Sequence, residues 1–283
     1  MRVLMFYSYK GGSGRTVAAA NVATALAKLG KKVAIVDLDF EAPGLQYVFG
    51  VEEAEQYKSG KGIQHYLRGE IGVQELDAEV AIDMFSKGSP MEGCVVPETA
   101  SLRYIMASPK VAQVDAQDRQ VVSRMRLLLM GLEEKHRVEF VILDSASGIR
   151  DTYSIAADAS QEMLMFFRWS TQHVEGTLRM ARYMKLLADF GQSRALPFKL
   201  VACATPDEEE LQTIADEPRR NSLLRIRRET KKRIEEMLVD CKASPETIFH
   251  EIPEMIELKW QDCITVFGGS TSPYETLAAK LLG

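Results

Sequence analysis

Short apolar runs alternate with longer amphipathic segments along this chain of 283 residues. Val3 to Tyr7, Val33 to Asp37 and Phe140 to Asp144 have the length and continuity of parallel strands buried on both faces. Between the first two, Val17 to Leu29 places Ala and Leu at helical spacing. This alternation predicts a doubly wound, mainly parallel sheet flanked by helices, a three-layer α/β/α fold.

The same alternation continues to the end of the chain. It predicts strands at 102–107, 163–167, 198–203 and 248–252, and helices at 117–135, 173–190 and 274–282. Residues 219–233 hold eight Arg or Lys and continue into an apolar segment, which predicts one basic helix at about 218–240. Several glycines break residues 51–100 into short helical pieces, and we interpret this segment as an insertion at the sheet edge. We therefore expect a single domain over residues 1–283.

A glycine-rich turn separates the first predicted strand from the first predicted helix. It runs from Ser8 to Thr16 and reads Ser-Tyr-Lys-Gly-Gly-Ser-Gly-Arg-Thr. Such a turn directs backbone N–H groups at one point, at the positive end of the helix dipole, and its glycines allow an anion to approach. Arg15 adds a permanent positive charge, and the Thr16 hydroxyl can bind Mg²⁺. The turn is predicted to bind phosphate; the alternative is a glycine turn that has basic residues by chance.

Carboxylates follow two other predicted strands. Asp37 and Asp39 come at the end of the second strand, and Asp144 ends the strand at 140–144. Ligands bind at the carboxyl ends of parallel strands in open sheets, so we expect these carboxylates to lie beside the glycine-rich turn. A strand that ends in Asp is the Walker B pattern, and Gly148 has the place of the glycine in a phosphate-sensing switch loop. Asp37 has a second interpretation, as a strand-end or helix-capping acid.

The turn also carries a family resemblance. Residues 10–16, Lys-Gly-Gly-Ser-Gly-Arg-Thr, resemble the deviant Walker A loop, K-G-G-x-G-K-[ST], of the ParA/MinD superfamily of P-loop ATPases. More narrowly, they resemble a variant branch whose loop reads K-G-G-x-G-R. The turn departs from the standard P-loop, G-x-x-x-x-G-K-[ST], at Tyr9 and at Arg15, which replaces the P-loop lysine. The resemblance is strongest over residues 1–45 and 138–151.

The resemblance implies a role for each residue of the predicted site. The residues that would bind ATP are Lys10, Gly11, Gly12, Ser13, Gly14, Arg15, Thr16, Val17, Asp37 and Gly148. Thr16, Asp39 and Asp144 would hold Mg²⁺. The catalytic set would be Lys10, Asp39 and Arg15: Asp39 would orient the attacking water, and Arg15 would hold the β- and γ-phosphates. Lys10 would reach the phosphate of a second subunit in a nucleotide-sandwich dimer, as an arginine finger does.

These roles imply an ATPase that dimerises on ATP binding and thereby switches its affinity for an unidentified protein partner. Because Arg is not a conservative replacement for Lys at a phosphate site, hydrolysis is expected to be slow or to need a partner. One alternative is a nucleotide-gated binding or regulatory module with negligible hydrolysis, and another is a P-loop metabolic ligase. The sequence contains no N-K-x-D motif for guanine, which favours ATP over GTP.

Net charge, cysteine content and the two ends of the sequence bear on binding partners and cellular location. The net charge is −5, which argues against a protein coated in nucleic acid, although residues 219–233 remain a candidate surface for non-specific DNA binding. The alternative is a solvated helix whose basic face pairs with the six acidic residues of 207–217. Four dispersed cysteines and an N-terminus that enters a strand directly predict a cytoplasmic location. Residues 278–283 are too short and too weakly charged for stable membrane attachment.

Overall fold

The computed structural model describes residues 1–110, 114–190, 196–205, 211–240, 248–255, 258, 261–268 and 272–283. Its strands are β1 (Arg2–Tyr7), β2 (Lys32–Leu38), β3 (Ala81–Asp83), β4 (Ser101–Ile105), β5 (Phe140–Ser145), β6 (Glu162–Arg168), β7 (Phe198–Thr205) and β8 (Ile248–Pro253). They form one sheet in the order β3-β4-β2-β5-β1-β6-β7-β8. Every pairing is parallel except that of β3 with β4. The predicted mainly parallel sheet is confirmed.

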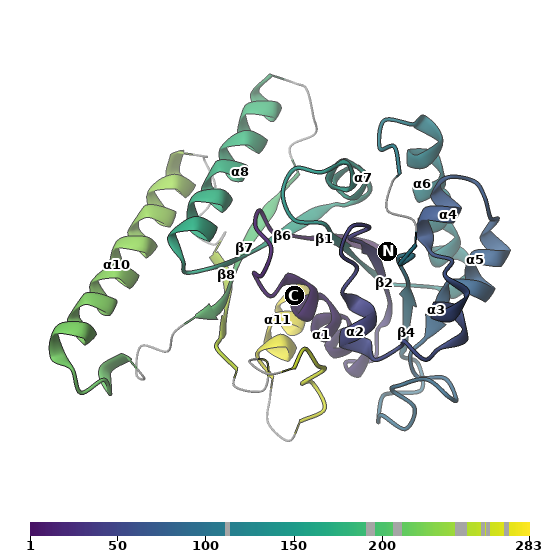
Figure 1. The fold of residues 1–283 in the computed structure, drawn as a ribbon, viewed down its shortest axis with the longest axis horizontal. Helices are drawn as coiled ribbons and strands as arrows, with labels where there is room; N and C mark the ends of the chain where they lie inside the picture. The colour runs from purple at the N-terminus through teal and green to yellow at the C-terminus, as the bar shows by residue number, and fades with distance from the viewer. Residues whose placement is uncertain are drawn as a thin grey trace.

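The helices surround this sheet. They are α1 (Arg15–Lys28), α2 (Leu45–Phe49), α3 (Glu55–Ser59), α4 (Ile63–Leu67), α5 (Val73–Glu79), α6 (Arg119–His136), α7 (Asp151–Ala159), α8 (Thr171–Asp189), α10 (Glu217–Asp240) and α11 (Pro273–Leu282). In Figure 1, α1 and α11 lie on one side of the sheet and α7 and α8 on the other. The predicted three-layer α/β/α architecture is therefore confirmed.

Each predicted strand and helix has a counterpart, with ends that shift by a few residues. The helix predicted from residue 117 begins at Arg119, because the Asp118 carboxylate accepts a hydrogen bond from the Gln120 N–H (2.8 Å) and caps the first turn. The sequence did not predict α2, α3, α7 or β3. The first two helices have 5 residues, α7 has 9 and β3 has 3, so their hydrophobic periods are too short to recognise.

Helix α1 is fixed between the sheet and α11. Ala18, Ala19 and Ala23 are fully buried, and small side chains let the helix lie close to both layers. Asn21 ties it to a loop far along the chain, because its side-chain amide donates to the Cys263 carbonyl (3.0 Å) and its Oδ1 accepts from the Thr265 N–H (2.7 Å). The N-terminus of α1, where the glycine-rich turn ends, is therefore held in place.

Residues 51–100 lie at the β3–β4 edge of the sheet, where α3, α4 and α5 pack near α6 (Figure 1). Hydrogen bonds join α4 to the segment that follows β4: the Ile63 N–H donates to Met106 O (2.9 Å), and the Ser108 N–H donates to Gln64 Oε1 (2.7 Å). Asp77 of α5 forms an ion pair with Arg103 (3.3 Å) and lies 3.1 Å from His136 Nε2 of α6. The segment is thus attached to both the sheet and α6.

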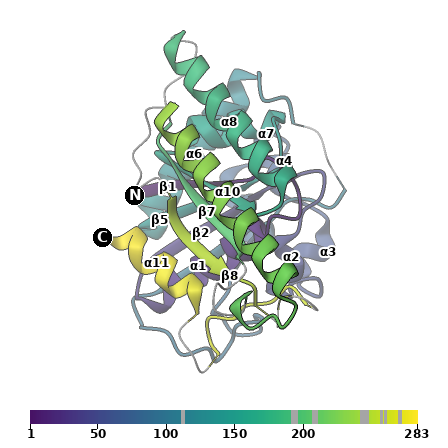
Figure 2. The same ribbon diagram turned by 90° about the vertical axis from the view of Figure 1, so that its left-hand side faces the viewer.

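The opposite end of the molecule is formed by α8 and α10, which lie side by side beyond β7 and β8 (Figure 2). Helix α10 is the outer of the two (Figure 1). Within the described part of the chain, no helix has both the length and the apolar character needed to span a membrane.

Candidate functional site

The predicted site lies where three neighbouring strands end. Strand β1 runs into the glycine-rich turn, Asp144 and Asp37 lie one residue before the ends of β5 and β2, and Asp39 directly follows β2. In the sheet these strands are adjacent, in the order β2-β5-β1. Asp37 and Asp144 are direct partners in the β2–β5 register. The expected convergence of carboxylates and turn is confirmed.

The turn has the geometry of an anion cradle. Gly12 and Gly14 adopt left-handed φ angles of 75° and 87°, which a side chain would strain. Gly14 is the N-cap of α1, which has no acidic residue in its first turn. The Arg15 N–H donates to Ser13 Oγ (3.3 Å), and no capping side chain binds the N–H groups that follow it, so these can bind an anion. A cavity of about 370 Å³ opens over residues 11–17 and also contacts Asp39 and Arg168.

The switch loop after β5 packs directly on this turn. The Gly148 N–H donates to the Ser8 carbonyl (3.0 Å), and Gly148 has a φ of 76°. A Cβ atom on Gly11 would lie 3.7 Å from the Ser147 Oγ, and one on Gly148 would lie 3.7 Å from the Tyr9 carbonyl oxygen. A group that binds in the turn therefore lies within reach of the 145–150 loop.

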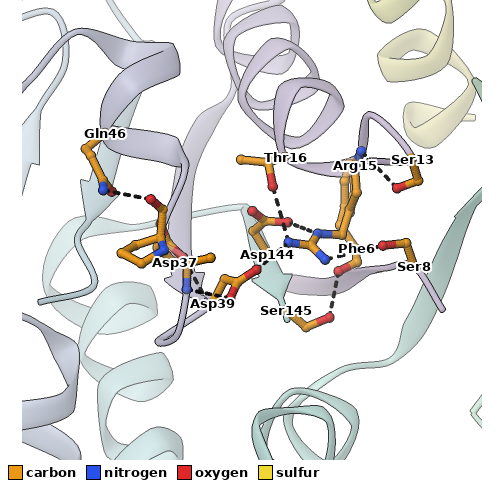
Figure 3. A network of polar contacts seen from close by, with 12 residues as sticks. Phe6, Ser8, Ser13, Arg15, Thr16, Asp37, Asp39, Gln46, Asp144 and Ser145 are labelled. Atoms are coloured by element: carbon orange, nitrogen blue, oxygen red, sulfur yellow. Dashed lines mark hydrogen bonds and ion pairs between the residues drawn. The ribbon is translucent and has the colours of Figure 1, made fainter. Parts of the chain in front are cut away.

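Arg15 occupies the centre of the site. Its guanidinium donates from Nε to Asp144 Oδ1 (2.6 Å) and from Nη2 to both Asp39 Oδ2 (3.1 Å) and Thr16 Oγ1 (3.2 Å) (Figure 3). Nη1 donates to Ser8 Oγ (3.3 Å). Burial alone would lower the pKa of Arg15, but the charges of Asp144 and Asp39 raise it. The sequence predicted that this side chain would hold phosphate, whereas here its partners are the three residues predicted to hold Mg²⁺.

The three carboxylates differ in exposure. Asp37 and Asp144 are fully buried, whereas 15% of the Asp39 side chain is exposed. Burial, followed by the charge of Asp144, raises the pKa of Asp37 well above its usual value. Burial also raises the pKa of Asp144, against the opposing charge of Arg15. The Asp37 side chain accepts a hydrogen bond from the Asp39 N–H (2.9 Å) and so orients the exposed carboxylate.

The remaining predicted binding residues lie around this centre. Ser13 is buried and its Oγ accepts from the Arg15 N–H (3.3 Å), whereas Val17 lines the cavity. Lys10 is exposed, and its ammonium donates to Gln172 Oε1 in the first turn of α8. Lys10 is therefore the predicted site residue that faces outward from the turn.

A second cavity, of about 300 Å³, continues from the turn toward the ends of β7 and β8. Its lining includes Gly14, Val17, Arg168, Ala204 and Pro253. Ala204 has a φ of 49°, a left-handed conformation that is costly for a residue with a side chain and is concentrated at binding sites. The place of this cavity beside the helix N-terminus suits the nucleoside part of a nucleotide.

Sequence reasoning missed the residues of this second cavity. Arg168 ends β6 beside the turn and lines both cavities, so it offers a further cation to a phosphate. The one available signal was its place at a strand end, but the apolar run that predicted the strand stops at Phe167. The sequence gives no reason to place Ala204 or Pro253 in a binding site, because each contributes backbone shape and not a reactive group.

Comparison with known proteins decides the family. The family described as CobQ/CobB/MinD/ParA nucleotide binding domain matches residues 4–260. The chain belongs to this family. It is therefore related to the ParA/MinD-like P-loop ATPases, as the resemblance implied.

Individual members of the CobQ/CobB/MinD/ParA family show the same relationship. The septum site-determining protein MinD of Synechocystis is 26% identical over 164 residues, which are 58% of this chain and 52% of that protein. MinD of Thermotoga maritima is 26% identical over 192 residues, 68% of this chain and 60% of that protein. The chain thus matches little more than half the length of these relatives.

Solved structures share the fold. A chain of the MinC:MinD cell division protein complex of Aquifex aeolicus superposes with a TM-score of 0.65 at 20% identity, covering 100% of this chain and 96% of that one. The ATP complex of a McdA variant from Cyanothece gives 0.68 at 15% identity, covering 99% and 96%.

The donor set of the predicted metal site suits Mg²⁺. Among the described residues, no group of three His, Cys, Asp or Glu side chains has an arrangement that could hold a metal by itself. The candidate ligands are two carboxylates and one hydroxyl, from Asp39, Asp144 and Thr16, which all contact Arg15. These are hard oxygen ligands of the kind that Mg²⁺ takes, with water and phosphate completing its shell. Asp144 Oδ2 is buried without a hydrogen-bond partner, so this oxygen can accept a further ligand.

The predicted basic helix, α10, extends over Glu217–Asp240. Its described ion pairs join Arg227 to Glu251 (3.6 Å), Arg233 to Glu175 of α8, and Arg225 and Lys232 to acids one turn along the same helix. Asp216 accepts a hydrogen bond from the Arg219 backbone N–H (3.1 Å), which is a contact at the start of the helix and not a charge pair with its basic face. Residues 206–210 lie outside the described part, so the predicted pairing of that face with 207–217 stays a prediction. Non-specific DNA binding by this helix stays a prediction.

Proposed function

We propose that this protein binds Mg-ATP in the cavity over residues 11–17 and forms a nucleotide-controlled sandwich dimer that switches its affinity for a protein partner. ATP hydrolysis in this scheme is slow or partner-stimulated, and the protein acts in the cytoplasm. The observation that carries the proposal is that the turn, Asp39 and Asp144 meet at the carboxyl ends of the neighbouring strands β1, β2 and β5. Three ends of parallel strands supply an anion cradle and oxygen donors at the same point.

In this proposal, each group of site residues has a separate role in phosphoryl transfer. The N–H groups at the start of α1 bind phosphate oxygens, and Arg168 adds a positive charge at the rim of the cavity. Thr16, Asp39 and Asp144 would hold Mg²⁺, which would neutralise part of the phosphate charge. Asp39 is the carboxylate open to the cavity, so it orients a water molecule for attack.

The exposed position of Lys10 supports dimer control. Its ammonium lies outside the buried cluster, bonded to Gln172 at the start of α8. A second copy that faces the turn would bring its phosphates toward this lysine, and the cation would then be supplied in trans. Turnover would depend on dimerisation for that reason.

A specific observation favours the regulatory alternative. Arg15 replaces the P-loop lysine and is bound to both Asp39 and Asp144. If it stays there when nucleotide binds, the carboxylates are not free for catalysis, and the protein is a nucleotide sensor with negligible hydrolysis. The metabolic ligase alternative requires ATP turnover that depends on a small carboxylate substrate.

Replacing Thr16 with alanine tests the nucleotide site. We expect Mg²⁺-dependent ATP affinity to fall by about 10- to 100-fold, because a hydrogen bond or ligand bond to a charged partner contributes about 1.5–3 kcal/mol. Affinity should be measured by isothermal titration with Mg²⁺ and with EDTA. Thr16→Ser keeps the hydroxyl and is expected to bind as wild type does. Equal affinity of Thr16→Ala and wild type in Mg²⁺ would contradict the assignment.

A further inference from the structure

The Arg15 guanidinium lies where a metal bound by Thr16, Asp39 and Asp144 would lie. It contacts one oxygen of each of these residues, at 3.2, 3.1 and 2.6 Å respectively. In Figure 3 the guanidinium lies among Asp144, Asp39 and Thr16, and its remaining nitrogen is bonded to Ser8. Only 6% of the Arg15 side chain is exposed and none of Asp144, so this is a built ion-pair network.

Charge explains why a cation must occupy this place. Asp37, Asp39 and Asp144 bring three carboxylates together, and two of these are fully buried. Burial of an unpaired carboxylate is unfavourable, and the mutual repulsion of neighbouring carboxylates adds to that cost. The guanidinium is the cation that contacts this cluster in the described structure, through two ion pairs.

The shape of arginine matters here. A guanidinium has five N–H donors in a fixed plane, and this one reaches Ser8, Thr16, Asp39 and Asp144 together. A lysine ammonium is a single point on a shorter chain and would not contact all four oxygens at once. The replacement of the P-loop lysine therefore creates a contact set that a lysine would not reproduce.

We propose that Arg15 is the resident cation of the metal site and excludes divalent metal from the nucleotide-free protein. Metal and guanidinium compete for the same three oxygen donors, so the metal enters only after Arg15 leaves. A triphosphate in the turn offers the guanidinium alternative anionic partners. Arg15 thus makes metal binding conditional on nucleotide. This inference rests on the proposed nucleotide site, but its test uses no nucleotide.

The test is Mn²⁺ binding by the nucleotide-free protein. Binding is measured as the loss of the free Mn²⁺ signal in electron paramagnetic resonance. Wild type is expected to bind no Mn²⁺ above background at millimolar concentrations. Arg15→Ala is expected to bind Mn²⁺ at least about tenfold more tightly, because removal of one positive charge leaves the carboxylates uncompensated. Mg²⁺ should raise the melting temperature of Arg15→Ala and leave that of wild type unchanged.

Two controls isolate the effect. Arg150→Ala removes an arginine charge just outside the cluster, where the side chain pairs with Glu41 (2.9 Å) and both are more than half exposed; it should behave as wild type. The double variant Arg15→Ala/Asp144→Asn should lose the Mn²⁺ binding that Arg15→Ala gains. If Arg15→Ala does not fold, Arg15→Gln serves instead, because its amide can still donate to Asp144.

Two results would overturn the inference. One is Mn²⁺ binding by nucleotide-free wild type as tight as that of the Arg15 variant. The other is a folded Arg15 variant that neither binds Mn²⁺ nor gains stability from Mg²⁺. Neither result depends on ATP hydrolysis or dimerisation, so failure of the proposed function and failure of this inference are distinguishable.

Discussion

Replacing Asp39 with alanine is expected to lower ATP turnover by about 10²–10⁴-fold, the usual contribution of a positioned acid–base group. Asp39 is the carboxylate of the cluster that reaches the cavity: its side chain is 15% exposed, whereas Asp37 and Asp144 are fully buried. A fully buried carboxylate cannot contact an attacking water from solvent. Nucleotide binding should persist, because the N–H groups of the turn and Arg168 remain. Phosphate release over several turnovers is the measurement.

Glu41→Ala is the matched control for Asp39→Ala. Glu41 lies two residues further along the same loop, is exposed, and pairs with Arg150 at the surface (2.9 Å). Its removal should leave turnover unchanged. Because Asp39 also holds Arg15, the folding of Asp39→Ala should be verified by thermal melting before its activity is interpreted. Turnover in Asp39→Ala equal to that in wild type would remove Asp39 from the mechanism.

Replacing Gly62 with alanine should destabilise the protein by about 3 kcal/mol, at the upper end of the usual cost of overpacking. A Cβ atom on Gly62 would lie 2.0 Å from the Ser108 nitrogen and 2.6 Å from the Ala107 carbonyl carbon. These are backbone atoms, and hydrogen bonds from Ser108 Oγ to Gly60 O (2.7 Å) and from Ser108 N–H to Gln64 Oε1 hold them in place. The clash can be relieved only if α4 moves away from the strand end.

Gly72→Ala gives the matched comparison for Gly62→Ala. Gly72 also precedes a short helix, α5, and its φ of −84° suits any residue. The nearest atom to an added Cβ is Glu75 Oε2 at 3.6 Å, an ordinary contact. Its substitution should destabilise the protein by only about 1 kcal/mol or less, because Ala is a poorer N-cap than Gly but meets no clash here. Urea denaturation of both variants measures the difference, and similar midpoints would show that residues 60–64 do not pack on 106–108 as described.

The sequence predicted the strand ends well, and the physical reason is simple. Buried parallel strands appear as continuous apolar runs, and an acid directly after such a run is placed at the sheet edge by the fold itself. Asp39 and Asp144 were located in this way, as was the turn after Tyr7. The short strand β3 and the five-residue helices α2 and α3 were missed, because so few residues show no period.

The sequence did not predict the partners of Arg15. An arginine beside a phosphate loop was assigned to phosphate, but carboxylates from two other strands compete for the same guanidinium. Which anion it binds depends on distances that only the folded chain sets. The second cavity, which Arg168 and Ala204 line, was missed for a similar reason, because the ends of β7 and β8 and the start of α1 build it together from separate parts of the chain.

The measurement that tests the central claim most directly is light scattering after size exclusion, with and without Mg-ATP, on wild type and Lys10→Ala, with phosphate release from the same samples. We expect ATP to double the mass of wild type, Lys10→Ala to remain monomeric, and phosphate to appear only with the dimer. If ATP binds while the mass of wild type stays constant and no phosphate forms, the protein is a monomeric nucleotide sensor. That result would contradict the proposed dimer-controlled ATPase.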